Sequence, residues 1–237
     1  MLLKSKISNI RIHSDEWHKT RIGKFTSSEA SSLIGSGSES YIRRKVGEEM
    51  TGKSSKAEVD TDATRWGAFH EAEAIQKFGI HQGLDFLIVQ QLITEENGRF
   101  GGTPDGIIPI RESADGMSYE VETVEVKCPP TFDNYLSLWE CETPLQLKSA
   151  KKEYYWQVLD QMDLCGCLKG YFVAYHPDFR AGNLRVIRFE ANEPSFDAKG
   201  NKVYPIYNDL KLLKEKKKMA SEQFDILRDK LLKVPAV

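Results

Sequence analysis

The segment GTPDGIIPIRESADGMSYEVETVEVK, residues 102–127, decides the fold class of this chain. It begins with a Thr-Pro-Asp-Gly turn at 103–106. Two stretches follow, 106–110 and 118–126, in which apolar residues alternate with others as they do in β-strands. The segment therefore predicts neighbouring strands in a sheet.

The sequence on either side of this segment alternates between helical and strand-like patterns. Helices are expected at 27–34 (with serines supplying the N-cap), at 41–50, at 64–78 (ended by Gly79), at 151–164 and at 205–232. Further strands are expected at 86–94, 170–175 and 184–189. This order predicts an α/β fold, a restriction-endonuclease-like core with a mixed β-sheet flanked by helices.

Length and composition predict one folded domain. The chain has 237 residues, of which 40% are hydrophobic and 29% charged, as in ordinary globular proteins. We expect a single domain, 1–237, in which a helical part, about 1–80, packs on the sheet core. The polar stretch 52–60 is interpreted as a loop. With no apolar run of about 20 residues and no signal peptide, the chain is expected in the cytoplasm.

Charge and cysteine content exclude other classes. The net charge of −2 excludes a protein that coats nucleic acid through bulk charge, so any such binding must be local. Candidate basic residues, for which a solvated helix face is an equal interpretation, are Lys211, Lys214, Lys216, Lys217 and Lys218, with Arg43, Arg44 and Lys45. The spacing of the cysteines favours reduced thiols over a zinc site, a disulfide framework or an iron–sulfur cluster; they are Cys128, Cys141, Cys165 and Cys167.

The strand at 118–126 carries a candidate catalytic pair. Residues two apart share a face of a strand, so Glu125 and Lys127 project together while Val126 turns into the core. If the turn with Asp105 lies beside this strand, Asp105 and Glu125 supply the hard oxygen ligands that Mg²⁺ prefers. Lys127 then orients a water or neutralises charge at a phosphoryl group. The alternative is an ordinary turn and an exposed ion pair.

The predicted helix at 64–78 carries a third carboxylate. Glu71 shares its stripe with the apolar residues 74, 75 and 78, whereas Glu73 lies on a mixed face with Phe69 and Lys77. A carboxylate directed inward is costly unless it is paired or bound to a metal. Glu71 is therefore the better candidate ligand, and Glu73 fits a surface glutamate.

One face of the predicted helix at 151–164 presents Tyr154, Gln157 and Gln161. A phenol and two amides thus face the same neighbour. For Tyr154 a plain core position is an equal interpretation.

These residues occur in five segments that together resemble the lambda exonuclease and YqaJ-like viral recombinase family of the PD-(D/E)xK nuclease superfamily. The segments, in order, are WHKTRIGKFTSS (17–28), WGAFHE (66–71), TPDG (103–106), EVKCP (125–129) and YYWQVLDQ (154–161). The resemblance covers most of the chain.

The resemblance implies a role for each matched residue. The implied magnesium ligands are Asp105, Glu125 and the main-chain carbonyl of Val126, with Glu71 at a second metal. Lys127 is placed at the nucleophilic water, with Gln157 as its support. The implied substrate-binding residues are Arg21 and Ser28 at a DNA phosphate, and Trp17, Tyr154 and Gln161. Asp133 departs from the family, which has a basic residue at this spacing from the catalytic lysine, and puts recognition of a 5′-phosphate in question.

The implied function is a Mg²⁺-dependent 5′ to 3′ exonuclease on double-stranded DNA, with Mn²⁺ as a substitute. The family forms homotrimers and works beside a single-strand annealing protein in phage-type recombination, which implies a phage or prophage gene expressed in a bacterial cell. Two alternatives stay open: an endonuclease on the same core, and an inactive DNA-binding subunit.

Overall fold

The two alternating stretches form adjacent strands of the largest sheet. The computed structural model describes residues 1–8, 10–12, 14–55, 61–84 and 87–234. In it, β7 (Gly106–Glu112) pairs antiparallel with β8 (Ser118–Lys127), and β9 (Lys169–Tyr175) pairs parallel with β8 on its other side. The strand order is β10-β9-β8-β7-β4, and β1 also pairs with β8; these further strands are β10 (Leu184–Glu190), β4 (Ile88–Val89) and β1 (Leu2–Leu3). The prediction of an α/β fold with a mixed sheet is confirmed.

The parallel pairing of β8 and β9 requires a long crossover, because the chain must return to the end of the sheet at which β8 begins. This crossover consists of three helices, α5 (Phe132–Trp139), α6 (Pro144–Ala150) and α7 (Lys152–Cys165). Gly166, with φ of 61°, ends α7 in the left-handed conformation. The predicted helix at 151–164 is thus confirmed within one residue.

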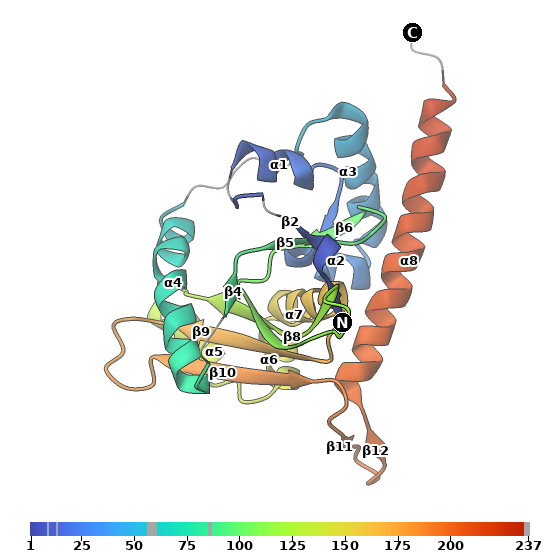
Figure 1. Cartoon of the computed structure of the whole chain (residues 1–237). Helices are drawn as coiled ribbons and strands as arrows, with labels where there is room; N and C mark the ends of the chain where they lie inside the picture. The colour runs from blue at the N-terminus through green and yellow to red at the C-terminus, as the bar shows by residue number, and fades with distance from the viewer. Residues whose placement is uncertain (9, 13, 56–60, 85–86, 235–237) are drawn as a thin grey trace.

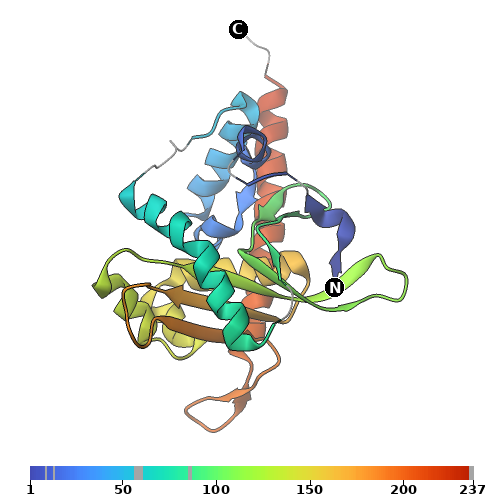
Figure 2. The ribbon, with the colours of Figure 1, turned by 60° about the vertical axis from the view of Figure 1, so that its left-hand side comes forward.

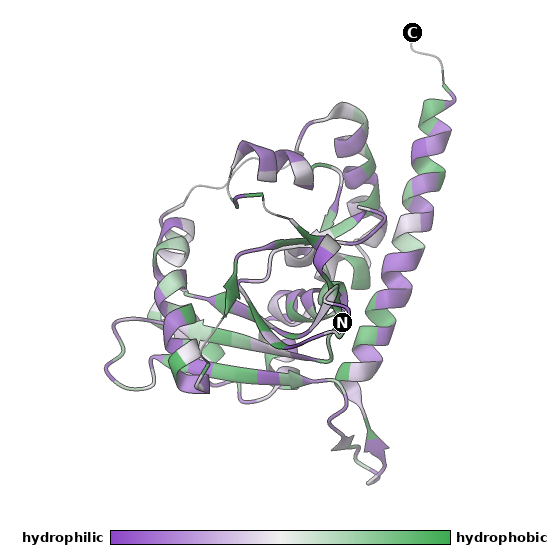
Figure 3. Ribbon diagram, in the orientation of Figure 1, coloured by the Kyte–Doolittle hydropathy of each residue, from purple (hydrophilic) through white to green (hydrophobic). Residues whose placement is uncertain are grey.

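Helices cover both faces of this sheet (Figures 1 and 2). On one face lies α4 (Asp62–Gln82), whose Phe78 packs in a cluster with Val124 and Val126. On the other face lies α7, and Glu125 of β8 points toward it. Figure 3 shows the matching pattern of largely hydrophobic sheet strands and mixed helices. The period-2 prediction that Val126 and Glu125 face opposite sides is confirmed.

A second sheet of four short strands brings the N-terminal region to the turn before β7. Its order is β2-β5-β6-β3, with bounds Ile7–Ser8, Leu92–Thr94, Phe100–Gly102 and Phe25–Thr26. The parallel pair β3–β6 sets Phe25 opposite Phe100. As a result, α1 (Asp15–Arg21) and the 3₁₀ helix η2 (Ser27–Glu29) lie near Thr103 and Asp105.

Three predicted elements have different bounds in the structure. The strand expected at 86–94 is wrong, because Gln90 has a φ of 53° and separates β4 from β5, which belong to different sheets; Phe86 lies outside the described residues. The helix α4 continues past Gly79 and ends at Gly83, whose φ is 64°. The helix expected at 27–34 is two elements, η2 and α2 (Ser31–Ile34), and neither has a serine cap.

The remaining elements lie outside the two larger sheets. They are η1 (Lys4–Lys6), α3 (Ser38–Thr51), the hairpin of β11 (Ser195–Phe196) and β12 (Lys202–Val203), and α8 (Pro205–Leu232). The long helix α8 packs against α3 and α7 along one side of the molecule (Figure 1). Of the expected loop at 52–60, residues 56–60 lie outside the described part.

The expected basic surfaces are partly wrong. Lys217 is buried and pairs with Glu95, Asp160 and Asp163. Lys45 is also buried, with Glu29 and Glu48 as its partners. These ammonium groups form ion pairs inside the protein and are not available to DNA, because a buried cation requires carboxylates around it. On α8, Lys211 and Lys218 are exposed.

All four cysteines are buried, and none of them forms a disulfide in the structure. Among the described helices, none combines the length and apolar composition needed to cross a bilayer.

Candidate active site

The turn before β7 places Asp105 directly beside β8. Its Oδ2 accepts a hydrogen bond from the backbone N–H of Val126 at 2.6 Å. The residues that the sequence analysis grouped as one constellation are therefore neighbours. The bond also fixes the turn to the strand that carries Glu125 and Lys127.

Glu125 is held from three directions on the α7 side of the sheet. Its carboxylate is only 1% exposed. Oε1 accepts from the ammonium of Lys127 and from the amide of Gln157, and Oε2 accepts from Nε2 of Gln161 at 2.5 Å. The amide of Gln157 thus contacts Glu125 and acts on Lys127 through the oxygen that both share.

The helix α4 brings Glu71 to the same region from the other face of the sheet. Glu71 is half-buried, and its Oε1 accepts from the amide of Gln90 at 2.7 Å. Glu73 is exposed and instead accepts from the hydroxyl of Tyr175 at 2.6 Å. Glu71 therefore faces inward and Glu73 faces the surface, as the helical spacing predicts.

Gln90 is a site residue that sequence reasoning missed. Its backbone N–H donates to the carbonyl of Asp105, so its main chain and its side chain both contact the site. Its place in the site depends on a left-handed backbone conformation, which is uncommon outside glycine. No sequence pattern reveals that conformation.

The site carries more negative than positive charge. Burial, together with the charges of Glu125 and Glu71, raises the pKa of the Asp105 carboxyl well above its ordinary value. Burial lowers the pKa of Lys127, but Glu125 and Asp105 outweigh burial and raise it, so Lys127 is a cation. With all groups ionised, three carboxylates face one ammonium, a net charge of −2.

This donor set fits a divalent cation in chemistry and charge. Carboxylate oxygens are the ligands of Mg²⁺, and the charge of the ion equals the excess at the site. One further oxygen, Oε1 of the buried Gln161, has no hydrogen-bond partner in the structure. The described residues contain no group of three or more His, Cys, Asp or Glu side chains placed to hold a metal, and Glu125 is bonded to Lys127 and two amides. Asp105, Glu125, the Val126 carbonyl and Glu71 are the groups that would hold it.

A cationic site lies next to the carboxylates. Arg21 stacks over the ring of Trp17, with its guanidinium carbon 4.1 Å from the ring centroid, and the indole N–H of Trp17 contacts Thr103. Burial lowers the pKa of Arg21, although the negative charge of Glu29 acts to raise it. Within the described part of the chain, no carboxylate lies at ion-pair distance from this guanidinium. Such a group is ready to bind an anion.

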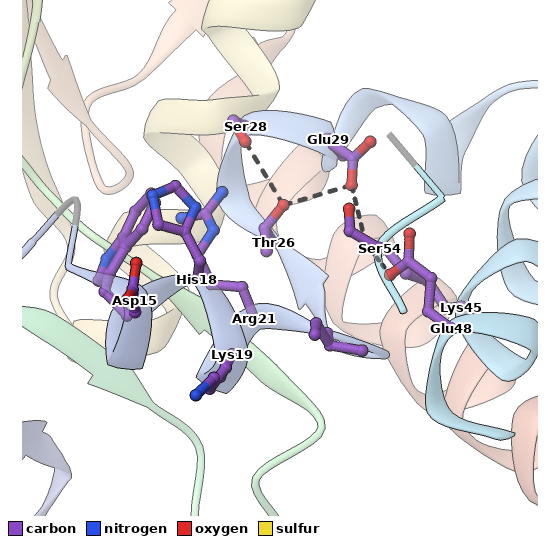
Figure 4. A pocket seen from close by; sticks show the side chains of 12 residues that line it. Asp15, His18, Lys19, Arg21, Thr26, Ser28, Glu29, Lys45, Glu48 and Ser54 are labelled. Atoms are coloured by element: carbon purple, nitrogen blue, oxygen red, sulfur yellow. Dashed lines mark hydrogen bonds and ion pairs between the residues drawn. The ribbon is translucent and has the colours of Figure 1, made fainter. Parts of the chain in front are cut away.

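Arg21 and Ser28 line two adjoining cavities. The smaller, of about 150 Å³, also contains Asp105, Glu71 and Gln157 in its walls. The larger, of about 520 Å³, extends away from the carboxylates toward α3. Figure 4 shows Arg21 and His18 on one side of this larger cavity and Thr26, Ser28 and Glu29 on the other.

The close approach of η2 to β6 depends on a glycine. A Cβ on Gly102 would lie 2.0 Å from Oγ of Ser27, so only glycine fits there. Ser27 in turn donates to Asp160 of α7 at 2.7 Å. This contact, which the sequence analysis missed, links the Ser28 region to the helix that carries Gln157 and Gln161.

Tyr154 lies beside Lys127 at the site, whereas Asp133 is not among the residues that line the neighbouring cavities. The half-buried Tyr154 stacks on Phe172, and the ammonium of Lys127 lies 5.4 Å from its ring centroid. Asp133 is exposed in the first turn of α5. Tyr154 thus packs against the core with its ring beside the Lys127 cation, and its contact with substrate stays a prediction.

Comparison with known proteins supplies a family and a fold. The sequence profile of the YqaJ-like viral recombinase domain matches residues 16–168. No curated protein matches this chain. Among solved structures, the alkaline exonuclease LHK-Exo from Laribacter hongkongensis is similar, with a TM-score of 0.64 and 20% identity over 94% of this chain and 100% of that chain. Its complex with dAMP has a TM-score of 0.63, with the same identity and coverage. A phage-related exonuclease from Haemophilus somnus 129PT has a TM-score of 0.60 and 16% identity over 88% of this chain and 96% of that chain. At these identities the likeness shows the shared fold.

Proposed function

Because this chain belongs to the YqaJ-like viral recombinase domain family, we propose that it is a nuclease that hydrolyses one strand of duplex DNA from its 5′ end with Mg²⁺. Mn²⁺ is the expected substitute. One observation carries the proposal: Asp105 and Glu71 line the same small cavity as Arg21, a guanidinium without an ion-pair partner among the described residues, and Asp105 is bonded to the strand that carries Glu125 and Lys127.

Each side chain has a task in phosphodiester hydrolysis. Asp105 and Glu125 would hold the divalent ion with the carbonyl of Val126, and Glu71 would hold or position a second one. The bound metal would activate water and stabilise the charge that develops on the phosphoryl group. Lys127 supplies a positive charge next to the attacking water, and Gln157 and Gln161 fix the orientation of Glu125.

The 5′ polarity rests on Arg21 and Ser28. A guanidinium and a hydroxyl bind a terminal phosphate better than an internal diester, because the terminal group carries more charge and has a further free oxygen. Trp17 holds Arg21 in place by stacking. We propose that these residues bind the 5′-phosphate while the next phosphodiester lies at Asp105 and Glu125. With Arg21→Ala and Ser28→Ala, the rate advantage of 5′-phosphorylated over 5′-hydroxyl duplex is expected to disappear.

We further propose a homotrimeric assembly that encloses the duplex. A single 27.0 kDa subunit with a net charge of −2 lacks the bulk charge to retain DNA, so retention must be topological. Cyclic association closes such a ring, and Lys211 and Lys218 on α8 remain available for its channel. The expected mass by light scattering is three times that of the chain, and a stable monomer or dimer at micromolar concentration would contradict the ring.

The family also indicates the setting. A viral recombinase domain is expected to act with a single-strand annealing protein, in the cytoplasm of a bacterial cell that carries the phage or prophage. Co-purification of the two products from a cell that expresses both tests this partnership.

The decisive experiment compares linear duplexes labelled at the 5′ or the 3′ end, with a closed circular plasmid as the control. Early release of the 5′ label, late release of the 3′ label and an intact circle support the proposal. A linearised or nicked circle would identify an endonuclease instead. Duplex binding without any hydrolysis in Mg²⁺ or Mn²⁺ would identify an inactive DNA-binding subunit.

A further inference from the structure

A third cavity lies on the far side of Glu71 from Arg21 and Ser28. We call it the α4–α7 cavity; it has a volume of about 580 Å³, which is within the usual range for ligand sites. Its walls include Gly67, Ala68, Val126, Lys127, Lys151 and Tyr154. Glu71 lines both this cavity and the small one at Arg21, so the two cavities meet at this carboxylate, with Asp105 in the wall of the small cavity and Lys127 in the wall of the α4–α7 cavity.

This position determines which part of a DNA strand reaches the cavity, given the proposed function. With the 5′-phosphate at Arg21 and the cleaved bond at the carboxylates, the strand continues on the opposite side of Glu71. The strand 3′ of the cleaved bond therefore lies where the α4–α7 cavity opens. The ligand must then be a phosphodiester backbone, which requires close approach and positive charge.

Gly67 permits such a close approach. It lies inside the helix α4, where glycine lowers helix stability relative to alanine. Packing within the protein does not require it, because an added Cβ would meet no atom nearer than the carbonyl oxygen of Cys128 at 4.0 Å. What distinguishes Gly67 from Gly79 of the same helix is its place in the wall of the α4–α7 cavity, where the missing side chain leaves room for a ligand backbone.

Lys151 supplies the positive charge. Two ammonium groups line the α4–α7 cavity, and that of Lys127 is engaged by Glu125. The half-buried Lys151 has no carboxylate partner among the residues that the structure describes. Its backbone is fixed by a 2.8 Å hydrogen bond to the carbonyl of Leu147, so the side chain can change without loss of the α6–α7 junction.

We propose that the α4–α7 cavity binds the phosphodiester backbone of the strand 3′ of the cleaved bond, with Gly67 admitting the backbone and Lys151 pairing with one phosphate. This inference deepens the proposed function, since it assigns the substrate contact opposite the 5′-phosphate. It also assigns the phosphate-binding cation of this cavity to Lys151.

The first test measures duplex affinity by fluorescence anisotropy in Ca²⁺, which permits binding without turnover. Lys151→Ala is expected to weaken binding about fivefold and to lower the slope of log Kd against log salt by about 1, as expected for one lost phosphate contact. The matched control is Lys152→Ala, because Lys152 is the exposed neighbour outside the cavity. The preference of Lys151→Ala for 5′-phosphorylated ends stays that of the wild type.

The second test uses two glycines of α4. Gly67→Ala and Gly79→Ala are both expected to raise Tm by about 2–4 °C through helix propensity, since neither added Cβ clashes. Only Gly67→Ala is expected to weaken duplex binding, because Gly79 lies outside the cavity. A folded Gly67→Ala protein with weaker binding excludes a purely structural role for the glycine.

The outcomes separate this inference from the proposed function. Equal affinities for Lys151→Ala and Lys152→Ala, or for Gly67→Ala and Gly79→Ala, overturn the inference even if the wild type releases nucleotides from the 5′ end. If Lys151→Ala and Gly67→Ala bind duplex more weakly as expected but the wild type degrades from the 3′ end, the DNA contact is supported. Its assignment to the strand 3′ of the cleaved bond is then overturned.

Discussion

Replacement of Lys217 by methionine is expected to destabilise the protein by about 3–5 kcal/mol, because it removes the cation from a buried cluster of carboxylates. The ammonium of Lys217 lies 2.6 Å from Oε1 of Glu95, 3.1 Å from Oδ1 of Asp160 and 2.7 Å from Oδ2 of Asp163. Its side chain is 5% exposed, and that of Asp160 is 3% exposed. Methionine fills a similar volume, so the change isolates the loss of charge.

The magnitude follows from the burial of the partners that remain. A broken buried ion pair costs more than a surface pair because water hardly reaches the carboxylates of Asp160 and Asp163, whose side chains are 3% and 11% exposed. For a chain of this size, 1 kcal/mol corresponds to about 2–4 °C in Tm, so a decrease of roughly 6–20 °C is expected. Burial lowers the pKa of Lys217, but the three carboxylates outweigh burial and raise it. A raised lysine pKa contributes stability below the unfolded value of 10.5, and the contribution is lost as pH rises through the folded value, so the effect is constant from about pH 6 to 9.

Thermal unfolding followed by circular dichroism measures this effect, with Lys218→Met as the matched control. Lys218 is the exposed neighbour of Lys217 on α8, and its replacement is expected to change stability by less than about 0.5 kcal/mol. If Lys217→Met unfolds within 2 °C of the control (a threshold of roughly the size of a surface effect), the buried ion cluster does not stabilise the fold and the reasoning is refuted.

Three further outcomes follow from the structure. Asp105→Asn is expected to abolish hydrolysis yet to raise the free energy of unfolding in EDTA by about 1–2 kcal/mol, because it removes a like charge beside Glu125 and Glu71; a lower Tm would contradict the charge excess at the site. Chelation by EDTA and Lys127→Ala are each expected to stop hydrolysis while Ca²⁺ still permits DNA binding, and full activity of Lys127→Ala in EDTA would exclude the mechanism. All four thiols are expected to react slowly with Ellman's reagent in the native protein and rapidly in guanidinium, since each is buried and burial raises the pKa of Cys128 to about 12; rapid native labelling would contradict this burial.

Local periodicity predicted much of the site from sequence. The alternation at 118–126 places Glu125 and Lys127 on one face and Val126 on the other, because side-chain direction in a strand depends only on residue parity. The stripe of α4 likewise predicted the inward position of Glu71 and the exposure of Glu73. The order of the matched motifs predicted the family.

Contacts between distant segments were decided by the tertiary structure alone. The parallel pairing of β3 with β6 brings η2 to Thr103, and the positive φ of Gln90 turns its amide to Glu71. Lys217 was interpreted as a surface residue because its neighbours in sequence are basic, whereas its partners lie 54 or more residues away along the chain. The sequence by itself thus determined which chemistry the chain carries and on which face of each element. The fold decided which of those faces meet, because strand pairing and helix packing depend on contacts that no local pattern encodes.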